Sequence, residues 1–264
     1  MKLISFNVSI KLDNTSAVIE LLDSVSADFI ALQESMIPHD DNVFPQYRSG
    51  DDIKKHLEKS HPYEFFAPLF IATCVEKNGR CHRDFGGRAE QGTQLLSKYP
   101  IESAQNLFYY NEYKNYYDAT NFREKDFVRS ILSAIVKLPS GKKFKIINVH
   151  GIWNADNMGD QRTIKQSEFI INEFKKDGIP TIVCGDFNLV PESESVKMFD
   201  HYFVNLVNEN GVKTTRPVVD DGLDRGDEVV DYILVSQGIK INDYKVMESA
   251  ATDHYPLILD FDMV

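Results

Sequence analysis

Five short apolar runs constrain the fold of this chain more than any other feature. Each is rich in Ile, Val, Leu and Phe, is bounded by turn or polar residues, and has the length of a buried strand rather than of a helix. The runs read LISFNV, DFIALQ, TIVCG, DYILV and PLILDF. Because strands that are apolar on both faces need cover on both sides, we expect them inside packed layers.

Two further strands and three helices complete the pattern. Ser130 to Leu138 and Lys143 to Val149 flank the turn sequence Pro-Ser-Gly-Lys, which predicts a hairpin. Helical patterns are expected at 16–25, 161–176 and 193–202. Strands that alternate with helices and then end the chain predict an α/β (α+β) fold, a four-layer α/β/β/α sandwich of two mixed β-sheets packed face to face with helices outside.

Two stretches look like loops, and one is ambiguous. Residues 78–92 hold four Gly, and residues 218–228 hold four Asp and two Gly. Residues 108–127 are rich in Tyr, Asn and charge, which fits either a surface hairpin that packs its own rings or a grip on a single nucleic-acid strand. Candidate functional residues recur from Asn7 to His254 without a linker, so residues 1–264 are expected to form one domain.

Composition and charge narrow the classes of partner. A chain of 264 residues that is 42% hydrophobic and 26% charged is typical of a globular protein, and this excludes a disordered or collagen-like chain. The net charge of −11 repels nucleic acid and anionic membranes at long range. Any phosphate partner therefore needs local help from a metal ion or a basic patch.

Targeting and cysteine signals are weak. The start MKLISFNVSI lacks the features of a signal peptide, and no apolar run is long enough to span a membrane, so a cytoplasmic location is expected.

The three cysteines, Cys74, Cys81 and Cys184, form no paired motif and fit reduced thiols. Cys74 and Cys81 with His82 could bind a metal, but an incidental loop is the preferred interpretation. No obligate protein partner is indicated.

Polar residues of catalytic type follow the buried strands. Ligands in open α/β sheets gather at the carboxyl ends of strands, and antiparallel strands bring the residues that precede them to the same end. The residues placed there are Asn7, Glu34, His150, Asp186, Asn188, Asp231, Asp253 and His254. An Asp or Asn at a strand end is individually more typical of a turn or a helix cap, but a carboxylate directly after an apolar strand, such as Glu34, is costly to bury unless it is paired or bound to metal.

The candidate ligands are hard oxygen donors. They suit Mg²⁺, with Mn²⁺ or Ca²⁺ as alternatives, whereas zinc would favour a cluster of His and Cys. Magnesium keeps waters and open positions, which hydrolysis of a phosphate ester requires. The sequence therefore predicts a magnesium site of a kind that could serve the hydrolysis of a phosphate ester.

Six strings in order carry a family resemblance. They are SFN ending at Asn7, LQE ending at Glu34, NVH ending at His150, GDFN from Gly185 to Asn188, DYI from Asp231, and TDHYP around Asp253 and His254. With these motifs the chain resembles the endonuclease/exonuclease/phosphatase superfamily, whose fold is similar to that of pancreatic deoxyribonuclease, over nearly its whole length.

The resemblance implies a division of roles. Glu34 would be the principal metal ligand, with Asn7 and Asp253 near the same ion. Asp186 would orient or deprotonate the attacking water with help from Asn188. His254, held by Asp231, would contact the phosphate, and His150 would be a candidate acid for the leaving group. In-line attack on phosphorus needs an aligned water, a cation on the phosphate oxygens and a route for a proton to the leaving group.

Three further residues are candidates for substrate binding. Arg129 opens the strand before the hairpin, where relatives often place an arginine that contacts phosphate; a surface ion pair is the alternative. Trp153, the only tryptophan, follows His150 in the unusual continuation Gly-Ile-Trp-Asn, which ends at Asn154. On a loop beside the phosphate site Trp153 could stack on a base or sugar, or it could pack under the loop.

Departures from subfamily patterns limit the substrate. NVH differs from the asparagine-ended motif of abasic-site endonucleases, and VVDYILV differs from the Trp-Cys-Asp-Arg string of inositol polyphosphate 5-phosphatases. The preferred function is a phosphodiesterase or nuclease that acts on nucleic acid or a nucleotide-like ester. The alternatives are a phosphomonoesterase for a small soluble or inositol-type phosphate, and a non-catalytic binding protein on the same fold.

Overall fold

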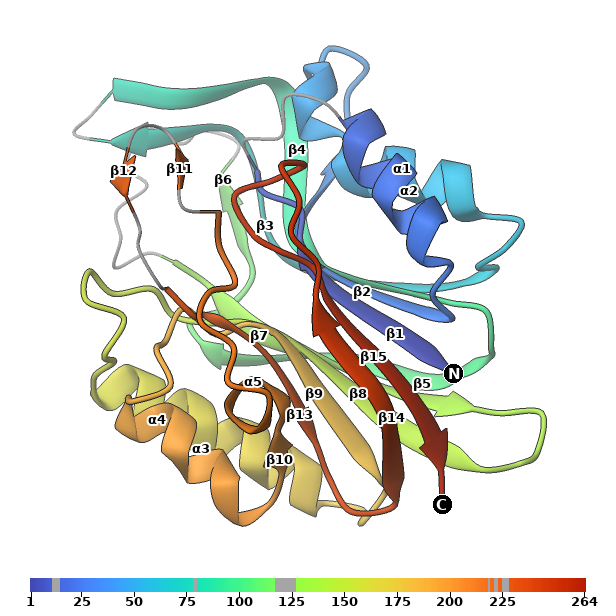
Figure 1. The fold of residues 1–264 in the computed structure, drawn as a ribbon. Helices are drawn as coiled ribbons and strands as arrows, with labels where there is room; N and C mark the ends of the chain where they lie inside the picture. Colours follow the sequence, from blue (N-terminus) through green and yellow to red (C-terminus); the bar gives the residue numbers. More distant parts are fainter. Residues whose placement is uncertain (11–14, 78–79, 117–126, 218, 221–222, 225–227) are drawn as a thin grey trace.

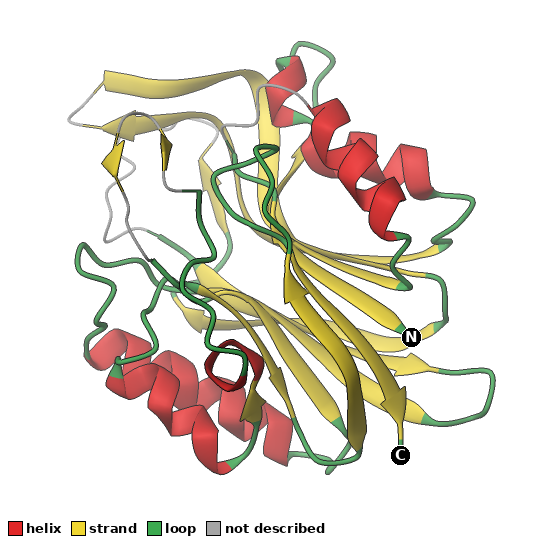
Figure 2. Cartoon of the chain, in the orientation of Figure 1, coloured by secondary structure: helices red, strands yellow, loops and turns green. Residues whose placement is uncertain are grey.

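The structure is a computed structural model that describes residues 1–10, 15–77, 80–116, 127–217, 219–220, 223–224 and 228–264. In these ranges, two mixed β-sheets pack face to face, and helices cover their outer faces (Figure 1, Figure 2). The predicted four-layer sandwich is confirmed.

The first sheet has seven strands in the order β14-β15-β1-β2-β4-β3-β6. Along the chain they are β1 (Lys2–Asn7), β2 (Phe29–Pro38), β3 (Tyr63–Lys77), β4 (Arg80–Ser97), β6 (Lys114–Tyr116), β14 (Ile239–Val246) and β15 (Leu257–Met263). Helices α1 (Thr15–Val25) and α2 (Ser49–Leu57) cover the outer face of this sheet (Figure 1). There Val18 and Leu22 of α1 join one apolar cluster with Phe6 and Ile30 of the sheet, and this burial holds the helix in place.

The second sheet has six strands in the order β10-β13-β9-β8-β7-β5. They are β5 (Ile101–Tyr110), β7 (Arg129–Lys137), β8 (Lys143–His150), β9 (Thr181–Asp186), β10 (Val204–Asn205) and β13 (Asp231–Val235). Its outer face carries α3 (Gln161–Lys175), α4 (Glu194–Lys197) and α5 (Leu206–Glu209) (Figure 1). Two 3₁₀ turns, η1 (Pro45–Tyr47) and η3 (Met198–His201), and a small hairpin of β11 (Val219–Asp220) and β12 (Leu223–Asp224) complete the described elements. None of the helices described is long and apolar enough to cross a membrane.

The core between the sheets contains interlocking aromatic rings. Phe144 of β8 packs edge-on against Phe29 of β2, with ring centroids 5.1 Å apart, and against Phe261 of β15 at 5.4 Å. All three side chains are fully buried. Edge-to-face contacts of this kind add to the free energy gained by burial, so they fix how the two sheets sit on each other.

Strand direction brings the ends of four strands to one edge of the sandwich. β1 runs parallel to β2, and β8 runs parallel to β9. β13 is antiparallel to β9 with Asp231 opposite Asp186, and β15 is antiparallel to β1. The expected strands, the hairpin of β7 and β8, and the antiparallel orientation of the last strands are thus confirmed.

The predicted loop at 78–92 is wrong for the residues that the structure describes. From Arg80 onward this segment belongs to β4, which pairs with β3 through several register shifts. Its glycines mark close backbone approaches: a Cβ on Gly92 would lie 2.4 Å from the carbonyl oxygen of Ala67. Glycine inside a strand signals such an approach as well as a turn, and the sequence does not distinguish the two.

Three other predictions are partly corrected. Residues 193–202 form α4 followed by the 3₁₀ turn η3 instead of one helix. The described parts of 108–127 do not make a hairpin, because β5 and β6 lie in different sheets and β6 pairs in parallel with β3; residues 117–126 lie outside the described residues. Within 218–228, the described residues include the hairpin of β11 and β12, and 218, 221–222 and 225–227 lie outside the described residues.

Gly185 of β9, directly before Asp186, allows the close approach of β8 and β9. Its φ is +133°, and an added Cβ would lie 2.0 Å from the carbonyl oxygen of Val149. We expect Gly185→Ala to lower the free energy of unfolding by about 3 kcal/mol, since the backbone of both strands must shift. Chemical denaturation measures this loss. Gly141→Ala is the matched control, because Gly141 has a φ of +82° but nothing within 4 Å; it should cost only about 1 kcal/mol, and equal losses would contradict the steric explanation.

Candidate active site

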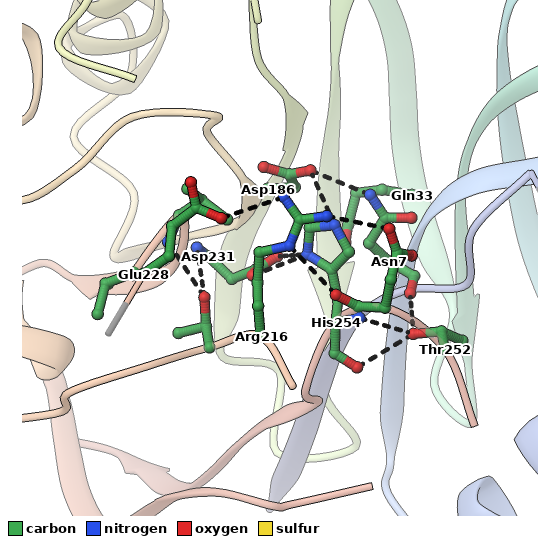
Figure 3. Close-up of polar contacts among 12 residues, drawn as sticks. Asn7, Gln33, Asp186, Arg216, Glu228, Asp231, Thr252 and His254 are labelled. Carbon is green, nitrogen blue, oxygen red and sulfur yellow. Dashed lines mark hydrogen bonds and ion pairs between the residues drawn. The ribbon is translucent and has the colours of Figure 1, made fainter. Parts of the chain in front are cut away.

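A cavity of about 420 Å³ opens where the strand ends meet. Eight of the eleven residues that the sequence nominated line it, namely Glu34, Arg129, His150, Trp153, Asp186, Asn188, Asp253 and His254. Asn7 and Asp231 lie behind this lining and bond to it (Figure 3). The tertiary structure therefore gathers residues from both sheets into one polar site.

Asp186 lies at the centre of the hydrogen-bond network. The side chain of Asn7 donates to its Oδ2 at 3.0 Å, and the backbone N–H of Asn188 donates to its Oδ1 at 2.8 Å. The Asn7 contact joins the first sheet to the second (Figure 3). Burial raises the pKa of Asp186 to about 6, although His254 opposes this rise. A buried carboxylate with such a pKa is suited to accept a proton near neutral pH.

His254 connects two carboxylates. Its Nδ1 lies 2.9 Å from Asp231 Oδ2, and its Nε2 lies 3.7 Å from Asp186 Oδ2. Burial alone would lower the pKa of His254, but the charges of Asp231 and Asp186 raise it to about 9. Thr252 orders the chain at this point, because its hydroxyl donates to the carbonyl oxygen of Asn7 at 3.0 Å and accepts from the backbone N–H of His254 (Figure 3). The imidazolium of His254 can therefore donate a hydrogen bond to an anion in the cavity.

A β-bulge aims Glu34 at the cavity. The pairing of β2 with β4 shifts register between Leu32 and Ser35, and Glu34 itself has a φ of +57°. Bulges beside active sites re-aim side chains in this way. Oε2 of Glu34 accepts from the backbone N–H of Ile10 at 2.6 Å, and Oε1 lies 3.6 Å from His150 Nε2. The carboxylate remains partly open to the cavity.

His150 is buried beside two positive groups. Burial lowers the pKa of His150 well below its ordinary value, and the charges of Arg129 and His254 lower it further. Its Nδ1 is buried without a hydrogen-bond partner among the described residues. The imidazole is therefore neutral at neutral pH and can donate a single hydrogen bond from Nε2 or Nδ1. Its role as an acid for the leaving group stays a prediction.

Asp253 is engaged by an arginine that the sequence did not single out. Arg216 donates from Nη2 to Asp253 Oδ2 at 3.0 Å and from Nε to the Asp253 carbonyl oxygen at 3.2 Å. Its Nη1 lies 3.3 Å from Glu228 Oε2 (Figure 3). Burial alone would raise the pKa of Asp253, but His254 and Arg216 lower it. Asp253 is thus ionised, with one oxygen held by Arg216.

The three candidate substrate-binding residues differ in position. Arg129 is buried and donates from Nε to the carbonyl oxygen of Gly151 at 2.7 Å and from Nη1 to that of Val128 at 3.0 Å. Because it is buried and forms no ion pair with the described residues, it differs from the surface ion pair considered as the alternative. Trp153 lines the cavity and keeps 45% of its surface exposed, so it does not pack under its loop. Asn154 is not among the cavity-lining residues, and its predicted role stays untested.

The donor set fits a divalent cation at Glu34. Glu34 supplies hard oxygen donors and faces the cavity without a Lys or Arg partner among the described residues. Asn7 accepts from the backbone N–H of Ser9 with its Oδ1, and its Nδ2 faces Glu34 and Asp186. Asp186, Asp231 and His254 also lie close enough to share an ion. Their atoms already bond to one another, however, and a protonated His254 cannot ligate a metal. The geometry favours Glu34 as the main metal ligand.

Sequence reasoning missed several lining residues. Besides Arg216, the cavity is lined by Ser9, Ile10, Phe70, Val75, His82, Arg83, Gln91 and Phe127. His82 and Arg83 belong to the segment that was interpreted as a loop. Among the described residues, His82 does not form a metal cluster with Cys74 and Cys81. A lone Arg or Phe without a motif carries no signal that links it to a site far away in sequence.

Solved structures with the same fold come from several organisms. A structure of an endonuclease/exonuclease/phosphatase from Beutenbergia cavernae has a TM-score of 0.75 at 12% identity, with 100% of this chain and 71% of that chain covered. The human nocturnin catalytic domain with bound sulfate has a TM-score of 0.67 at 15% identity, over 100% and 93% of the chains. A mannosyl-6-phosphatase from Bacteroides thetaiotaomicron has a TM-score of 0.67 at 14% identity, over 100% of both chains. At these identities the likeness concerns the fold.

The sequence also matches a family model. Among curated proteins no sequence matches significantly. The model of the Endonuclease/Exonuclease/phosphatase family matches residues 4–254. Members of that family are generally phosphoesterases and typically depend on a divalent metal. Because the match covers nearly the whole chain and includes every catalytic and metal-binding position nominated above, the protein belongs to the Endonuclease/Exonuclease/phosphatase family.

Proposed function

We propose that the protein is a magnesium-dependent phosphodiesterase that acts on nucleic acid or a nucleotide-like ester, in which Asp186 activates the attacking water. The observation that carries this proposal is the environment of Asp186: a buried carboxylate at the cavity, fixed by Asn7 and Asn188, with its pKa raised to about 6 by burial. A fixed carboxylate of this kind orients a water and accepts its proton as the water attacks phosphorus.

His254 and Arg129 stabilise the charge on the phosphate. His254 carries a proton at neutral pH because Asp231 holds its Nδ1, so its Nε2 side donates toward the cavity. Arg129 is fixed by backbone carbonyl oxygens and lines the same cavity. Preorganised cationic donors are most effective where charge develops in the transition state. Asn188 keeps Asp186 in place, and the neutral His150 donates a hydrogen bond toward the leaving oxygen.

Glu34 would hold the metal ion, with Asn7 and Asp253 near it. The chemistry that a bound Mg²⁺ would supply there is neutralisation of charge on the phosphate oxygens and polarisation of the phosphoryl group. The bulge in β2 and the hydrogen bond from the backbone N–H of Ile10 already orient the Glu34 carboxylate toward the cavity. The protein therefore does not have to reorganise this carboxylate when the ion binds, which favours affinity.

Two model substrates test the proposal. Bis-(p-nitrophenyl) phosphate and p-nitrophenyl phosphate are compared with magnesium, with manganese and with a chelator. We expect release of p-nitrophenol from the diester in the presence of metal, and we expect this release to stop when the chelator is added. Hydrolysis that continues in the chelator would contradict the metal dependence, and absence of hydrolysis of both esters and of a mixed panel of natural phosphate esters would favour the non-catalytic alternative.

A phosphomonoesterase is the second candidate. It is favoured by the size of the cavity, since about 420 Å³ suits a small molecule, and by the mannosyl-6-phosphatase from Bacteroides thetaiotaomicron with the same fold. Metal-dependent release from p-nitrophenyl phosphate alone would decide for this candidate.

A further inference from the structure

Trp153 is an exposed ring on a rigid support. The backbone before it is tied to three elements: the N–H of Gly151 donates to the carbonyl oxygen of Asp186 at 2.7 Å, the carbonyl oxygen of Gly151 accepts from Arg129 at 2.7 Å, and the N–H of Ile152 donates to Gln166 Oε1 at 2.8 Å. Gly151 lies so close to the residue after β9 that a Cβ would sit 2.1 Å from the carbonyl oxygen of Phe187. The loop is thus fixed where it enters Trp153, although 45% of the Trp153 surface remains exposed.

A second hollow adjoins the cavity at this tryptophan. Phe127, Arg129 and Trp153 line both the main cavity and the smaller hollow, whose other lining residues are Tyr110, Ile152 and Arg162. The guanidinium of Arg129 lies 5.0 Å from the ring centroid of Phe127. Aromatic side chains and a guanidinium thus line the same cavity as Asp186 and His254, and this combination favours a planar ring attached to a phosphate.

Arg129 forms no ion pair with the residues that the structure describes. Its hydrogen bonds in the described residues go to backbone carbonyl oxygens, and no carboxylate of those residues lies within ion-pair distance. A buried guanidinium with neutral partners gains when an anion reaches it. The net charge of −11 and the limited cavity volume disfavour a long polyanion, so the anion is expected on a small molecule.

We infer that Trp153, Phe127 and Arg129 form a subsite for a nucleobase, and that the substrate is a small nucleotide-like phosphate ester. This inference rests on the proposed function for the position of the scissile phosphate, near Asp186 and His254. The base stacks on Trp153, and a phosphate oxygen accepts from Arg129. Trp153 then selects the substrate, whereas the residues around Asp186 carry out the hydrolysis.

Intrinsic fluorescence tests the subsite without any need for turnover. Trp153 is the only tryptophan of the chain, so its emission reports on this position alone. The full chain carrying Asp186→Asn, which is expected to slow turnover, is titrated with adenosine 5′-monophosphate in the presence of Mg²⁺, and ribose 5-phosphate is added as a competitor. We expect saturable quenching and at least ~10-fold weaker binding of ribose 5-phosphate, the effect of losing one stacked base. Unchanged emission, or equal affinity for both compounds, would overturn the inference.

Variants of Trp153 separate stacking from a displaced loop. Titration calorimetry is done in the same Asp186→Asn chain. Trp153→Ala should weaken the binding of adenosine 5′-monophosphate ~10-fold, and Trp153→Phe should keep most of the affinity. Ribose 5-phosphate should bind all variants alike. Tyr63→Ala is the control, an aromatic side chain of similar exposure outside the cavity. Equal weakening of both ligands by Trp153→Ala would overturn the subsite.

The outcomes distinguish this inference from the proposed function. If base-dependent binding is found and no phosphate ester is hydrolysed, the proposed function fails and the subsite stands. If diester hydrolysis depends on metal but adenosine 5′-monophosphate does not change the emission of Trp153, the subsite fails and the proposed function stands.

Discussion

Asp186→Asn is expected to reduce kcat by at least ~100-fold, the lower range for loss of a general base. Asparagine keeps the size of the side chain and can still accept from the N–H of Asn188, but it cannot take a proton from water. KM should change little, since the phosphate contacts of His254 and Arg129 remain. Steady-state hydrolysis of bis-(p-nitrophenyl) phosphate with Mg²⁺ measures both quantities.

Asp200→Asn is the control for this substitution. Asp200 is exposed in the 3₁₀ turn η3 and does not line the cavity. The control should keep wild-type kinetics, and both variants should unfold at nearly the wild-type denaturant midpoint. Turnover by Asp186→Asn within about threefold of wild type would remove Asp186 from the mechanism, because a general base supplies far more than that.

Glu34→Ala is expected to weaken metal binding by at least ~10-fold, since loss of even an outer partner of a metal ligand has an effect of this size. Most turnover at limiting magnesium should disappear with it. Glu34 is the one carboxylate aimed at the cavity by a bulge and without an Arg or Lys partner among the described residues, so no neighbour in the described structure replaces it. Calorimetric titration with Mn²⁺ gives the affinity, and a series of Mg²⁺ concentrations gives the activity.

Glu20→Ala provides the comparison for Glu34→Ala. Glu20 is exposed on α1, outside the cavity, and its loss should leave both measurements unchanged. Saturating Mg²⁺ should rescue part of the turnover of Glu34→Ala if the defect lies in metal affinity. A Glu34→Ala protein that binds Mn²⁺ as tightly as wild type would assign the metal to other residues, with Asp186 and Asp231 the next candidates.

Several features followed from local sequence alone. The apolar runs predicted β1, β2, β9, β13 and β15, because continuous Ile, Val and Leu over a strand length is stable only with both faces covered. The polar residues that follow the runs predicted Asn7 and Asp186 at strand ends, since these ends gather at one edge of a sheet. Glu34 was expected at a strand end as well, but β2 continues to Pro38, and Glu34 lies within it at the bulge. Strand and site follow from the same short segments, and no distant information is needed for them.

Other features depended on contacts between distant segments. The glycines of β4 look like loop signals in the sequence, and only the backbone of β3 shows that Gly92 allows two strands to approach. Arg216 belongs to no motif, yet it forms an ion pair with Asp253, 37 residues later in the chain. The sequence placed Asp186 and His254 in the site, but it did not determine their protonation. Burial sets the pKa of Asp186 near 6, and two carboxylates set that of His254 near 9.

The sequence by itself thus determined which strands form and which polar residues stand at their ends, because both depend on side-chain type and period within a few residues. The tertiary structure alone decided the charge states in the site, the partner of Asp253 and the exposure of Trp153 beside Arg129. These properties depend on desolvation and on distances between groups far apart in the chain, which no local pattern encodes.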